Sequence, residues 1–235
     1  MNVLLTKPSV LSEYLQEKNI AHQTLKMFDY RRTVSLAFLR QVLVGEQYDL
    51  VVLSSPAAID IYLKCNVVNK VACISGSSAK KLSDLQPIYL QSKPYDGASL
   101  ARHIINILPD NATRILILAG ADGQSGMFDK LSAYYQTVKK LEIYERVRPE
   151  YDRESLETVF YGNVFDTVVV TCNTAVQNLL YYIDKYYLQF NLDCNLIVPS
   201  KRVADFALRH NFKKIITAES IDDQDLLDKI LAVKQ

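Results

Sequence analysis

The sequence has no tryptophan and only three histidines and four cysteines among its 235 residues. No histidine begins an HxH or HExxH motif, and no two cysteines form a CxxC pair. Because these residues are the usual zinc ligands, a metal site is not expected. The cysteines are expected to be reduced and mostly buried, as in cytosolic proteins; they are Cys65, Cys73, Cys172 and Cys194.

The sequence also lacks an excess of one charge and lacks a long apolar run. Its 27 basic and 26 acidic residues give no electrostatic footprint for nucleic acid or an anionic membrane. No apolar run approaches the roughly 18 residues of a membrane-spanning helix. Lys7 and Pro8 interrupt the apolar start of the chain too early for a signal peptide. We therefore expect a soluble, cytoplasmic protein in which any anion binding is local.

Signatures of nucleotide binding and of nucleophilic catalysis are missing as well. The glycine-rich stretch 120–126 is not followed by the Lys-Ser/Thr pair of a phosphate loop. No GxGxxG follows the first apolar run, and no GxSxG occurs. These absences disfavour a nucleotide-dependent transferase. They favour binding, or a reaction that depends on holding a reactive substrate in the correct geometry.

The sequence does contain a regular alternation of short apolar runs and longer helical patterns. Short β-branched runs are typical of buried parallel strands. The runs are 3–6, 50–54, 71–74, 88–90, 115–118, 138–144, 168–171, 196–198 and 215–217, and the clearest helical patterns are 57–64, 79–85, 99–108, 174–187 and 201–209. This order predicts an α/β fold built of doubly wound parallel sheets.

The chain also repeats itself. Residues 165–176 resemble residues 48–59, and the second copy begins 117 residues after the first. A period this long predicts two similar domains rather than a solenoid. We assign residues 1–30 plus 150–235 to one discontinuous domain and residues 31–149 to an inserted one. The two crossings, near 25–32 and 141–149, are extended in character, which predicts a two-stranded connector.

The turns that follow the strands are the candidate binding residues, because ligands of open parallel sheets bind beyond the carboxyl ends of the strands. Nearly all of these turns consist of small polar residues; they are 6–9, 54–56, 75–78, 119–126, 171–174 and 199–202. Two interpretations stay open. Each turn taken alone can be a helix cap. As a set, helix N-termini from two facing domains would line a cleft for a ligand with many carboxylates.

One tyrosine stands out by its position. Tyr144 lies on the last strand expected for the inserted domain, where the chain returns to the other one. It is either a packing tyrosine, like most of the 15 in the chain, or a residue that faces the hinge and the cleft.

Taken together, these segments resemble the uroporphyrinogen-III synthase family over essentially the whole chain. The matching segments are 3–8, 48–58, 74–79, 141–145, 165–176 and 198–204. The resemblance implies two flavodoxin-like domains, the first discontinuous, joined by a β-ladder. It also implies cyclisation of hydroxymethylbilane, a linear tetrapyrrole with eight carboxylates. The terminal hydroxyl leaves as water, ring D is inverted through a spiro intermediate, and no cofactor or metal takes part.

The resemblance also assigns roles to residues. Tyr144 matches the family tyrosine proposed to help the hydroxyl leave, and a phenol can donate a proton or a hydrogen bond at neutral pH. The substrate-binding set is expected to comprise Lys7, Ser54, Ser55, Ser77, Ser78, Gly120, Thr171, Cys172, Asn173, Thr174, Ser200, Lys201 and Arg202. Lys7 stands where many members carry arginine, and Cys172 replaces a serine. The turn 199–202 replaces a Gly-Pro-x-Thr turn, so a side-chain role at its rim is in doubt.

Two functions from different classes therefore remain. The first is a monomeric cyclising synthase, with the upstream deaminase as a transient partner that hands over the substrate. The second is a non-catalytic two-lobed binding protein for a small polyanion, which the altered turn at 199–202 keeps open.

Overall fold

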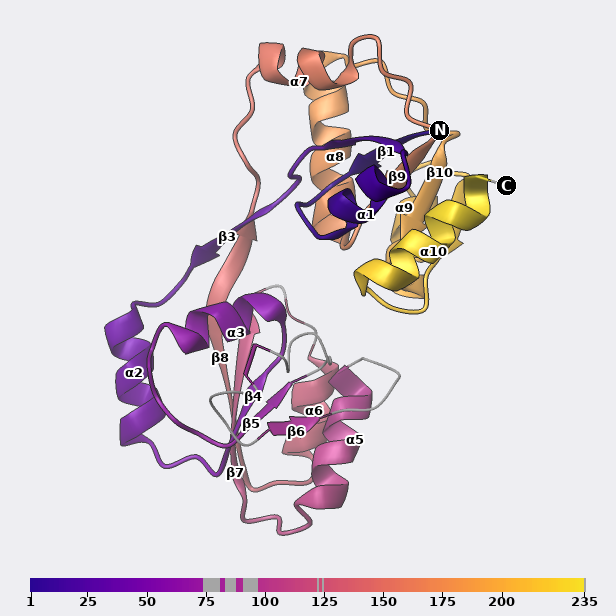
Figure 1. The fold of residues 1–235 in the computed structure, drawn as a ribbon. Helices are drawn as coiled ribbons and strands as arrows, with labels where there is room; N and C mark the ends of the chain where they lie inside the picture. The colour runs from indigo at the N-terminus through magenta and orange to yellow at the C-terminus, as the bar shows by residue number, and fades with distance from the viewer. Residues whose placement is uncertain (74–80, 83–87, 91–96, 122, 124, 235) are drawn as a thin grey trace. The chain divides into compact units, whose positions relative to one another are not determined.

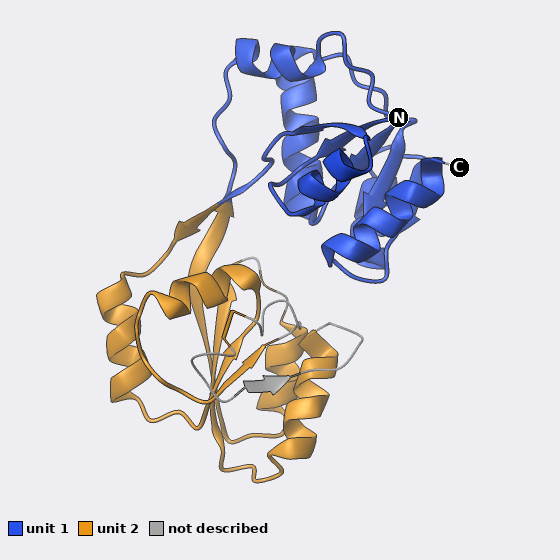
Figure 2. Cartoon of the chain, in the orientation of Figure 1, with its two compact units in different colours: residues 1–29, 147–235 blue, residues 30–146 orange. Residues whose placement is uncertain are grey.

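The computed structural model of the chain describes residues 1–73, 81–82, 88–90, 97–121, 123 and 125–234. The chain divides into two compact units: unit 1 comprises residues 1–29 and 147–235, and unit 2 comprises residues 30–146 (Figure 2). Each unit is a sheet of mainly parallel strands with helices on both faces (Figure 1). The predicted α/β class is thus confirmed. The bounds 1–30 with 150–235 and 31–149 stay a prediction about independently folding domains, which limited proteolysis would test.

Unit 1 is built on a five-stranded parallel sheet in the order β11-β10-β9-β1-β2. Its strands are β1 (Asn2–Leu5), β2 (Ala21–Thr24), β9 (Thr167–Val169), β10 (Asn195–Val198) and β11 (Lys214–Thr217). Side chains alternate between the two faces of the sheet: Leu4 packs in one core cluster, and Val3 and Leu5 pack in the other. The central strands β1, β9 and β10 are apolar on both faces because helices cover both.

The helices of unit 1 follow the same division into two layers. They are α1 (Leu11–Glu17), α7 (Arg153–Phe160), α8 (Asn173–Tyr186), α9 (Lys201–Leu208) and α10 (Asp223–Lys234). Buried residues of α1 and α10 pack in the cluster that contains Val3 and Leu5. Buried residues of α7, α8 and α9 pack in the cluster on the other face, around Leu4.

Unit 2 contains a six-stranded sheet in the order β3-β8-β7-β4-β5-β6. Its strands are β3 (Asp29–Arg32), β4 (Leu50–Leu53), β5 (Val71–Cys73), β6 (Ile88–Leu90), β7 (Arg114–Gly120) and β8 (Thr137–Val147), and its helices are α2 (Leu36–Gly45), α3 (Pro56–Leu63), α5 (Gly97–Ile107) and α6 (Gly126–Ser132). The strands β3 and β8 lie at the two crossings between the units and are neighbours in the sheet. This pairing confirms the predicted two-stranded connector.

The repeated sequence has the same structure in both units. Its first copy forms β4 and α3, and its second forms β9 and α8. In unit 2, the Asp49 carboxylate accepts a 2.7 Å hydrogen bond from the N–H of Arg114, the first residue of β7. In unit 1, the matching Asp166 accepts one of 2.7 Å from the N–H of Asn2, the first residue of β1. Each aspartate thus joins two central strands at the amino edge of its sheet.

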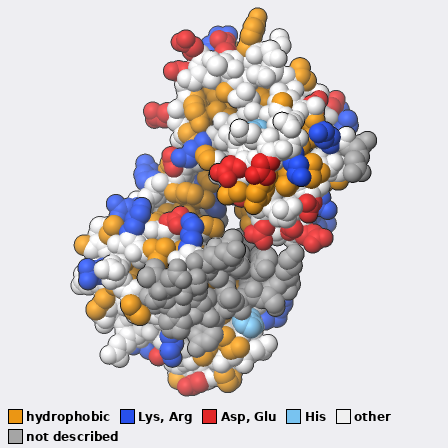
Figure 3. All heavy atoms as spheres, viewed as in Figure 1, with side chains coloured by type: hydrophobic (Ala, Val, Ile, Leu, Met, Phe, Trp, Pro, Cys, Tyr) orange, Lys and Arg blue, Asp and Glu red, His pale blue; other side chains and the backbone are white. Residues whose placement is uncertain are grey.

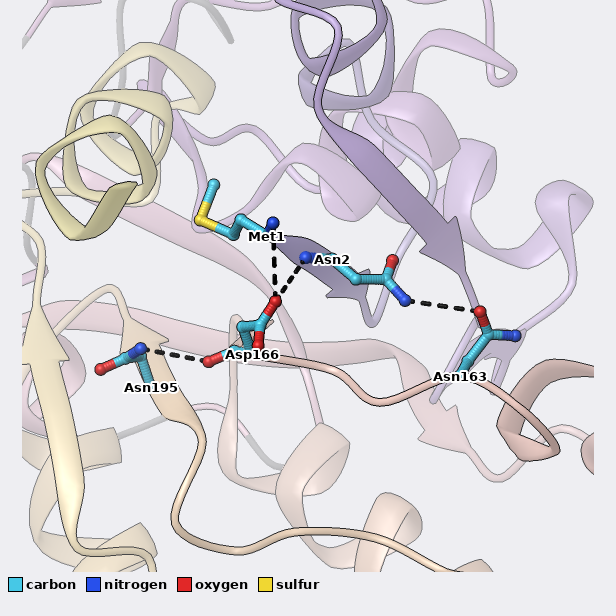
Figure 4. A network of polar contacts seen from close by, with 5 residues as sticks. All are labelled: Met1, Asn2, Asn163, Asp166 and Asn195. Carbon is cyan, nitrogen blue, oxygen red and sulfur yellow. Dashed lines mark hydrogen bonds and ion pairs between the residues drawn. The ribbon is translucent and has the colours of Figure 1, made fainter. Parts of the chain in front are cut away.

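Further polar contacts reinforce this amino edge in unit 1 (Figure 4). The N-terminal ammonium of Met1 lies 3.7 Å from the Asp166 carboxylate, and the Asn195 side chain donates to the Asp166 carbonyl at 3.1 Å. Asn163 accepts a weaker bond of 3.4 Å from Asn2. The repeated aspartate is therefore a structural residue at the amino edge of its sheet.

The surface carries both charges. On the face shown in Figure 3, Lys and Arg side chains are interspersed with Asp and Glu side chains, which agrees with the net charge of +1. Among the described residues, none of the helices has the length and the apolar character needed to cross a membrane.

Candidate functional site

Each sheet has one topological switch point, where the order of strands reverses and successive connections leave on opposite faces. In unit 1, where the chain order across the sheet is 2-1-3-4-5, it lies between β1 and β9. In unit 2, counting β4 to β8 in chain order, the sheet reads 3-2-1-4-5 and the switch point lies between β4 and β7. The loops separate at such a point, so the carboxyl edge there is the usual ligand site of an open α/β sheet.

In unit 2, a register shift brings Tyr144 to this edge. Strands β7 and β8 pair one to one as far as Ala119 with Glu142, and the next pair is Gly120 with Tyr144. The extra residue, Ile143, makes a β-bulge, a feature that re-aims the side chain after it. Ile143 is fully buried in the core cluster shared by α2 and α3, and Tyr144 packs at the end of that cluster.

The ring of Tyr144 lies directly against the backbone of Gly120. A Cβ atom placed on Gly120 would be 2.7 Å from two ring carbons of Tyr144 and 2.9 Å from its hydroxyl oxygen. These distances are too short for any real Cβ, so the ring occupies the space that a side chain would need. Tyr30, which is 46% exposed, packs edge-on against the same ring with centroids 5.2 Å apart. Tyr144 itself is only 2% exposed.

The hydroxyl of Tyr144 is held by the N-cap of α3. Its oxygen lies 2.9 Å from Oγ of Ser55. The same Oγ accepts a 3.1 Å hydrogen bond from the N–H of Ala58 and so caps the helix. The neighbouring Ser54 donates its hydroxyl to the carbonyl of Leu118 at 3.0 Å, which joins β4 to β7. The structure therefore brings together three predicted site residues: Ser55, Gly120 and Tyr144.

In unit 1, hydroxyl and ammonium groups gather at the corresponding edge. Thr6, just after β1, donates its hydroxyl to the carbonyl of Val169 at 2.8 Å, as Ser54 does to Leu118 in unit 2. Lys7 and Thr171 line a hollow beside it, together with Ser9. The volume of this hollow is about 10 Å³, which suffices for one water molecule. It is a shallow depression at the switch point and not a preformed pocket.

The 14-residue helix α8 begins at this edge without a side-chain cap. Its N-cap residue, Cys172, is extended, with φ −163° and ψ 164°, and makes no capping hydrogen bond through its side chain. The N–H of Ala175 bonds the Cys172 carbonyl at 3.1 Å. In the described part of the chain, the backbone N–H groups of Asn173 and Thr174 have no acceptor, and the buried Oδ1 of Asn173 has no donor.

Helix α9 begins in the same way, next to α8 along the sheet. Its N-cap, Ser200, is extended and makes no side-chain capping bond, and Lys201 and Arg202 form its exposed first turn. No carboxylate among the described residues forms an ion pair with Lys7, Lys201 or Arg202. The carboxyl edge of unit 1 thus combines helix N-termini that have no side-chain cap with three cationic side chains.

The remaining predicted residues divide as follows. Thr171, Cys172, Asn173 and Thr174 lie at the start of α8, and Ser200, Lys201 and Arg202 lie at the start of α9. Ser77 and Ser78 lie outside the described residues. Thr6 lies in the predicted turn 6–9, although the predicted substrate-binding set named only Lys7 from that turn. Sequence reasoning missed Tyr30, whose polar surroundings gave no signal. Among the described residues, no cluster of His, Cys, Asp and Glu is arranged to hold a metal ion.

Two sheets of mainly parallel strands, each with small polar turns at its switch point, define the class of two-unit α/β proteins with doubly wound sheets. The profile of the uroporphyrinogen-III synthase HemD family matches residues 39–228. The chain belongs to this family. The resemblance inferred from the sequence is thereby confirmed.

Individual relatives agree with this assignment. The uroporphyrinogen-III synthase of Escherichia coli (strain K12) is 31% identical over 115 residues, which are 48% of this chain and 47% of that protein. The chain thus spans about half the length of the curated relatives it matches. The crystal structure of uroporphyrinogen-III synthetase from Helicobacter pylori 26695 has a TM-score of 0.68 at 13% identity and covers 99% of both chains. A mutant uroporphyrinogen III synthase from Thermus thermophilus has a TM-score of 0.55 at 12% identity over 100% of this chain and 99% of that one. At these identities the two structures establish the fold.

Proposed function

We propose that this chain is a uroporphyrinogen-III synthase, which cyclises hydroxymethylbilane with loss of water and inversion of ring D. One observation carries the proposal: in a member of the HemD family, the hydroxyl of Tyr144 is fixed against Ser55 at the switch point of unit 2. A phenol held at a ligand-binding edge can act as a general acid.

The proposed chemistry is redox-neutral, which is why it needs no cofactor. Tyr144 donates a proton or a hydrogen bond to the terminal hydroxyl of the substrate, and the C–O bond breaks to release water. The resulting conjugated cation is attacked by the substituted carbon of ring D, which gives the spiro intermediate. One bond of this spiro centre then breaks and re-forms at the other position. Loss of a proton from ring D then restores its aromatic pyrrole, and ring D is left inverted.

The carboxyl edge of unit 1 is proposed to bind carboxylate groups of the substrate. The N–H groups of Asn173 and Thr174 have no acceptor among the described residues, and a helix N-terminus favours an anion. Lys7, Lys201 and Arg202 add positive charge at the same edge. The unpaired Oδ1 of Asn173 is an acceptor, for which a pyrrole N–H of the substrate is a suitable donor.

The setting of the reaction is part of the same proposal. We take the protein to be a cytoplasmic monomer that receives hydroxymethylbilane from the upstream deaminase in a transient hand-over. Such a transfer would limit spontaneous closure of the free substrate, which gives isomer I.

A product analysis tests the function directly. Purified protein is incubated with freshly prepared hydroxymethylbilane, and the oxidised products are separated into uroporphyrin isomers I and III. The expected result is isomer III, formed faster than isomer I in a buffer control. Isomer I alone, at the spontaneous rate, would overturn the proposal.

Binding without catalysis is the second candidate function. The observation in its favour is that Tyr144 is 2% exposed and its hydroxyl already contacts Ser55. The same assay separates the candidates, because a binding protein would slow or leave unchanged the formation of isomer I. Calorimetric titration with a stable porphyrin polycarboxylate would then still report an interaction.

A further inference from the structure

The Ser55 hydroxyl has a second partner besides Tyr144, and this favours one of the two possible directions of the hydrogen bond between the two hydroxyls. A serine hydroxyl carries one proton and two lone pairs. Oγ of Ser55 accepts from the N–H of Ala58 at 3.1 Å, at the positive end of α3. A hydroxyl that accepts such a bond becomes a better donor, because bonds in a chain polarise one another. Either hydroxyl can be the donor across the 2.9 Å between the two oxygens, and this polarisation favours Ser55 as the donor.

We infer that Ser55 is a positioning residue for Tyr144: it donates its hydroxyl proton to the Tyr144 oxygen and so leaves the phenol proton for the leaving hydroxyl of the substrate. This inference rests on the proposed function, in which Tyr144 donates to that hydroxyl. It moves Ser55 from the carboxylate-binding set to the set that controls the acid. The side chain acts through Tyr144 and has no carboxylate to hold.

The packing of Tyr144 explains why a single hydrogen bond is enough to fix the phenol. The backbone of Gly120 contacts one part of the ring, and Tyr30 packs edge-on against it. The β-bulge at Ala119 and Gly120 fixes the backbone of Tyr144, whose carbonyl accepts from the N–H of Ala121 at 2.8 Å. Rotation about the C–O bond is the freedom that remains. In the described part of the chain, Ser55 is the one hydrogen-bond partner of the Tyr144 hydroxyl.

The chain supplies a matched control for the loss of the helix cap. Ser35 caps α2 in the same unit and accepts from the N–H of Phe38 at 3.1 Å, the same distance as in the bond from Ala58 to Ser55. Among the described residues, the Tyr144 hydroxyl bonds Ser55 and not Ser35. Replacing either serine by alanine removes one equivalent cap, and only Ser55→Ala also removes the bond to the phenol.

The experiment measures kcat and KM for isomer III formation in Ser55→Ala, Ser55→Thr and Ser35→Ala. We expect Ser55→Ala to lower kcat roughly tenfold with little change in KM, because the lost bond acts on the reacting proton. Ser55→Thr keeps the hydroxyl and should restore most of kcat. Ser35→Ala should leave both constants unchanged. Adding Ser55→Ala to Tyr144→Phe should cause little further loss of kcat, because both changes remove the same hydrogen bond between Ser55 and the phenol.

The opposite outcomes overturn the inference in distinct ways. A raised KM with unchanged kcat in Ser55→Ala would make the side chain a substrate ligand. Full additivity with Tyr144→Phe would separate the two residues. In a sample whose tyrosines carry a carbon-13 label at Cζ, the Tyr144 resonance, assigned by its loss in Tyr144→Phe, should shift in Ser55→Ala and not in Ser35→Ala. An unshifted resonance removes the bond whatever the activity, whereas wild-type protein that forms no isomer III removes the proposed function itself.

Discussion

The two copies of the repeat use their helix N-termini in different ways. In unit 2, α3 begins with Pro56, which has no N–H, and Ser55 occupies the N–H of Ala58. In unit 1, α8 begins with Asn173 and Thr174, and the side chain of its N-cap residue, Cys172, makes no capping bond. The N-terminus of α3 thus holds a side chain, whereas two backbone N–H groups at the N-terminus of α8 have no acceptor among the described residues.

This difference in capping affects the stability of the helices. A side-chain cap stabilises a helix by about 0.5–2 kcal/mol relative to alanine. Helices α8 and α9 both forgo this stabilisation, whereas α3 has it. A carboxylate bound at α8 would make the hydrogen bonds that a cap would otherwise make. In the proposed function, unit 2 carries the catalytic group and unit 1 binds anions, and the following variants test that division.

The largest expected effect is that of Tyr144→Phe. Removing the phenol hydroxyl removes the proposed acid, so kcat for isomer III should fall about 100-fold with little change in KM. Tyr135→Phe is the matched control, because Tyr135 is a buried tyrosine of the same unit whose hydroxyl donates to the carbonyl of Leu108 at 2.7 Å. Both variants should lose about 1 kcal/mol of stability in urea unfolding. An unchanged kcat in Tyr144→Phe would remove unit 2 from the chemistry.

A smaller effect is expected from Gly120→Ala. The new Cβ would lie 2.7 Å from the Tyr144 ring, so the ring must shift, which should disturb its 2.9 Å hydrogen bond to Ser55. We expect kcat to fall roughly tenfold and stability to fall by about 1–3 kcal/mol, as for other overpacked sites.

Gly126→Ala serves as the control for Gly120→Ala, because a Cβ there meets no atom within 4 Å. Gly126 opens α6, where alanine should be neutral or slightly stabilising. Urea titration followed by circular dichroism and the isomer assay give the two readouts. Wild-type kcat in Gly120→Ala would show that the position of the ring is irrelevant.

In unit 1, the test is a proline at the first position of α8. Asn173→Pro removes one backbone N–H while keeping a residue that a helix tolerates at this position. The preceding Cys172 is already extended, which suits a residue before proline. We expect KM to rise roughly fivefold relative to Asn173→Ala, which removes the side chain alone, with kcat unchanged. Equal KM values in the two variants would exclude this N–H from substrate binding.

The smallest expected effect concerns a residue in the core of unit 1 and not the carboxyl edge of either sheet. Burial raises the pKa of the Cys194 thiol in unit 1 to about 11. The folded protein therefore keeps this proton where the unfolded chain loses it. The resulting stability is full below the unfolded thiol pKa near 9 and is lost as pH rises from about 9 to about 11.

The prediction is that Cys194→Ala shows a shallower loss of stability across this range than the wild type. Urea unfolding at pH 8, 9 and 10.5 measures it, with circular dichroism as the signal because the chain has no tryptophan. Burial also raises the pKa of Tyr135 in unit 2, to about 12, which places its contribution at higher pH. Parallel stability profiles in the two proteins would contradict the assignment to Cys194.

Much of the fold could be predicted because the central strands are apolar on both faces. The run at 50–54 became β4, and the run at 168–171 became β9 with bounds shifted by one or two residues. Strand β2 was missed because its residues, Ala21–Thr24, are mostly exposed at the edge of the sheet. An apolar sequence pattern indicates that side chains are buried. An edge strand pairs through its backbone and buries few side chains, so its sequence shows no such pattern. The predicted helix 79–85 falls mainly outside the described residues.

The sequence predicted which turns form the candidate site, but it did not predict which side chains in the site contact one another. Ser55, Gly120 and Tyr144 were each singled out from the sequence, the first two as substrate-binding residues and Tyr144 as the catalytic one. The bond between Ser55 and Tyr144 joins residues 89 positions apart. The reason for a glycine at position 120 is the tyrosine ring of another strand, which no local pattern contains. Tyr30 was missed for the same reason, because its role depends on the ring against which it packs.

The sequence by itself determined the two-unit α/β architecture, the repeat and the family, because these follow from local periodicity and from residues that match in order. Only the tertiary structure decided that the repeated aspartates join strands at the amino edge, and that a bulge sets Tyr144 over Gly120 and against Ser55. The physical reason is that burial imposes a pattern on neighbouring residues, whereas register and side-chain contact are settled between strands distant in the chain.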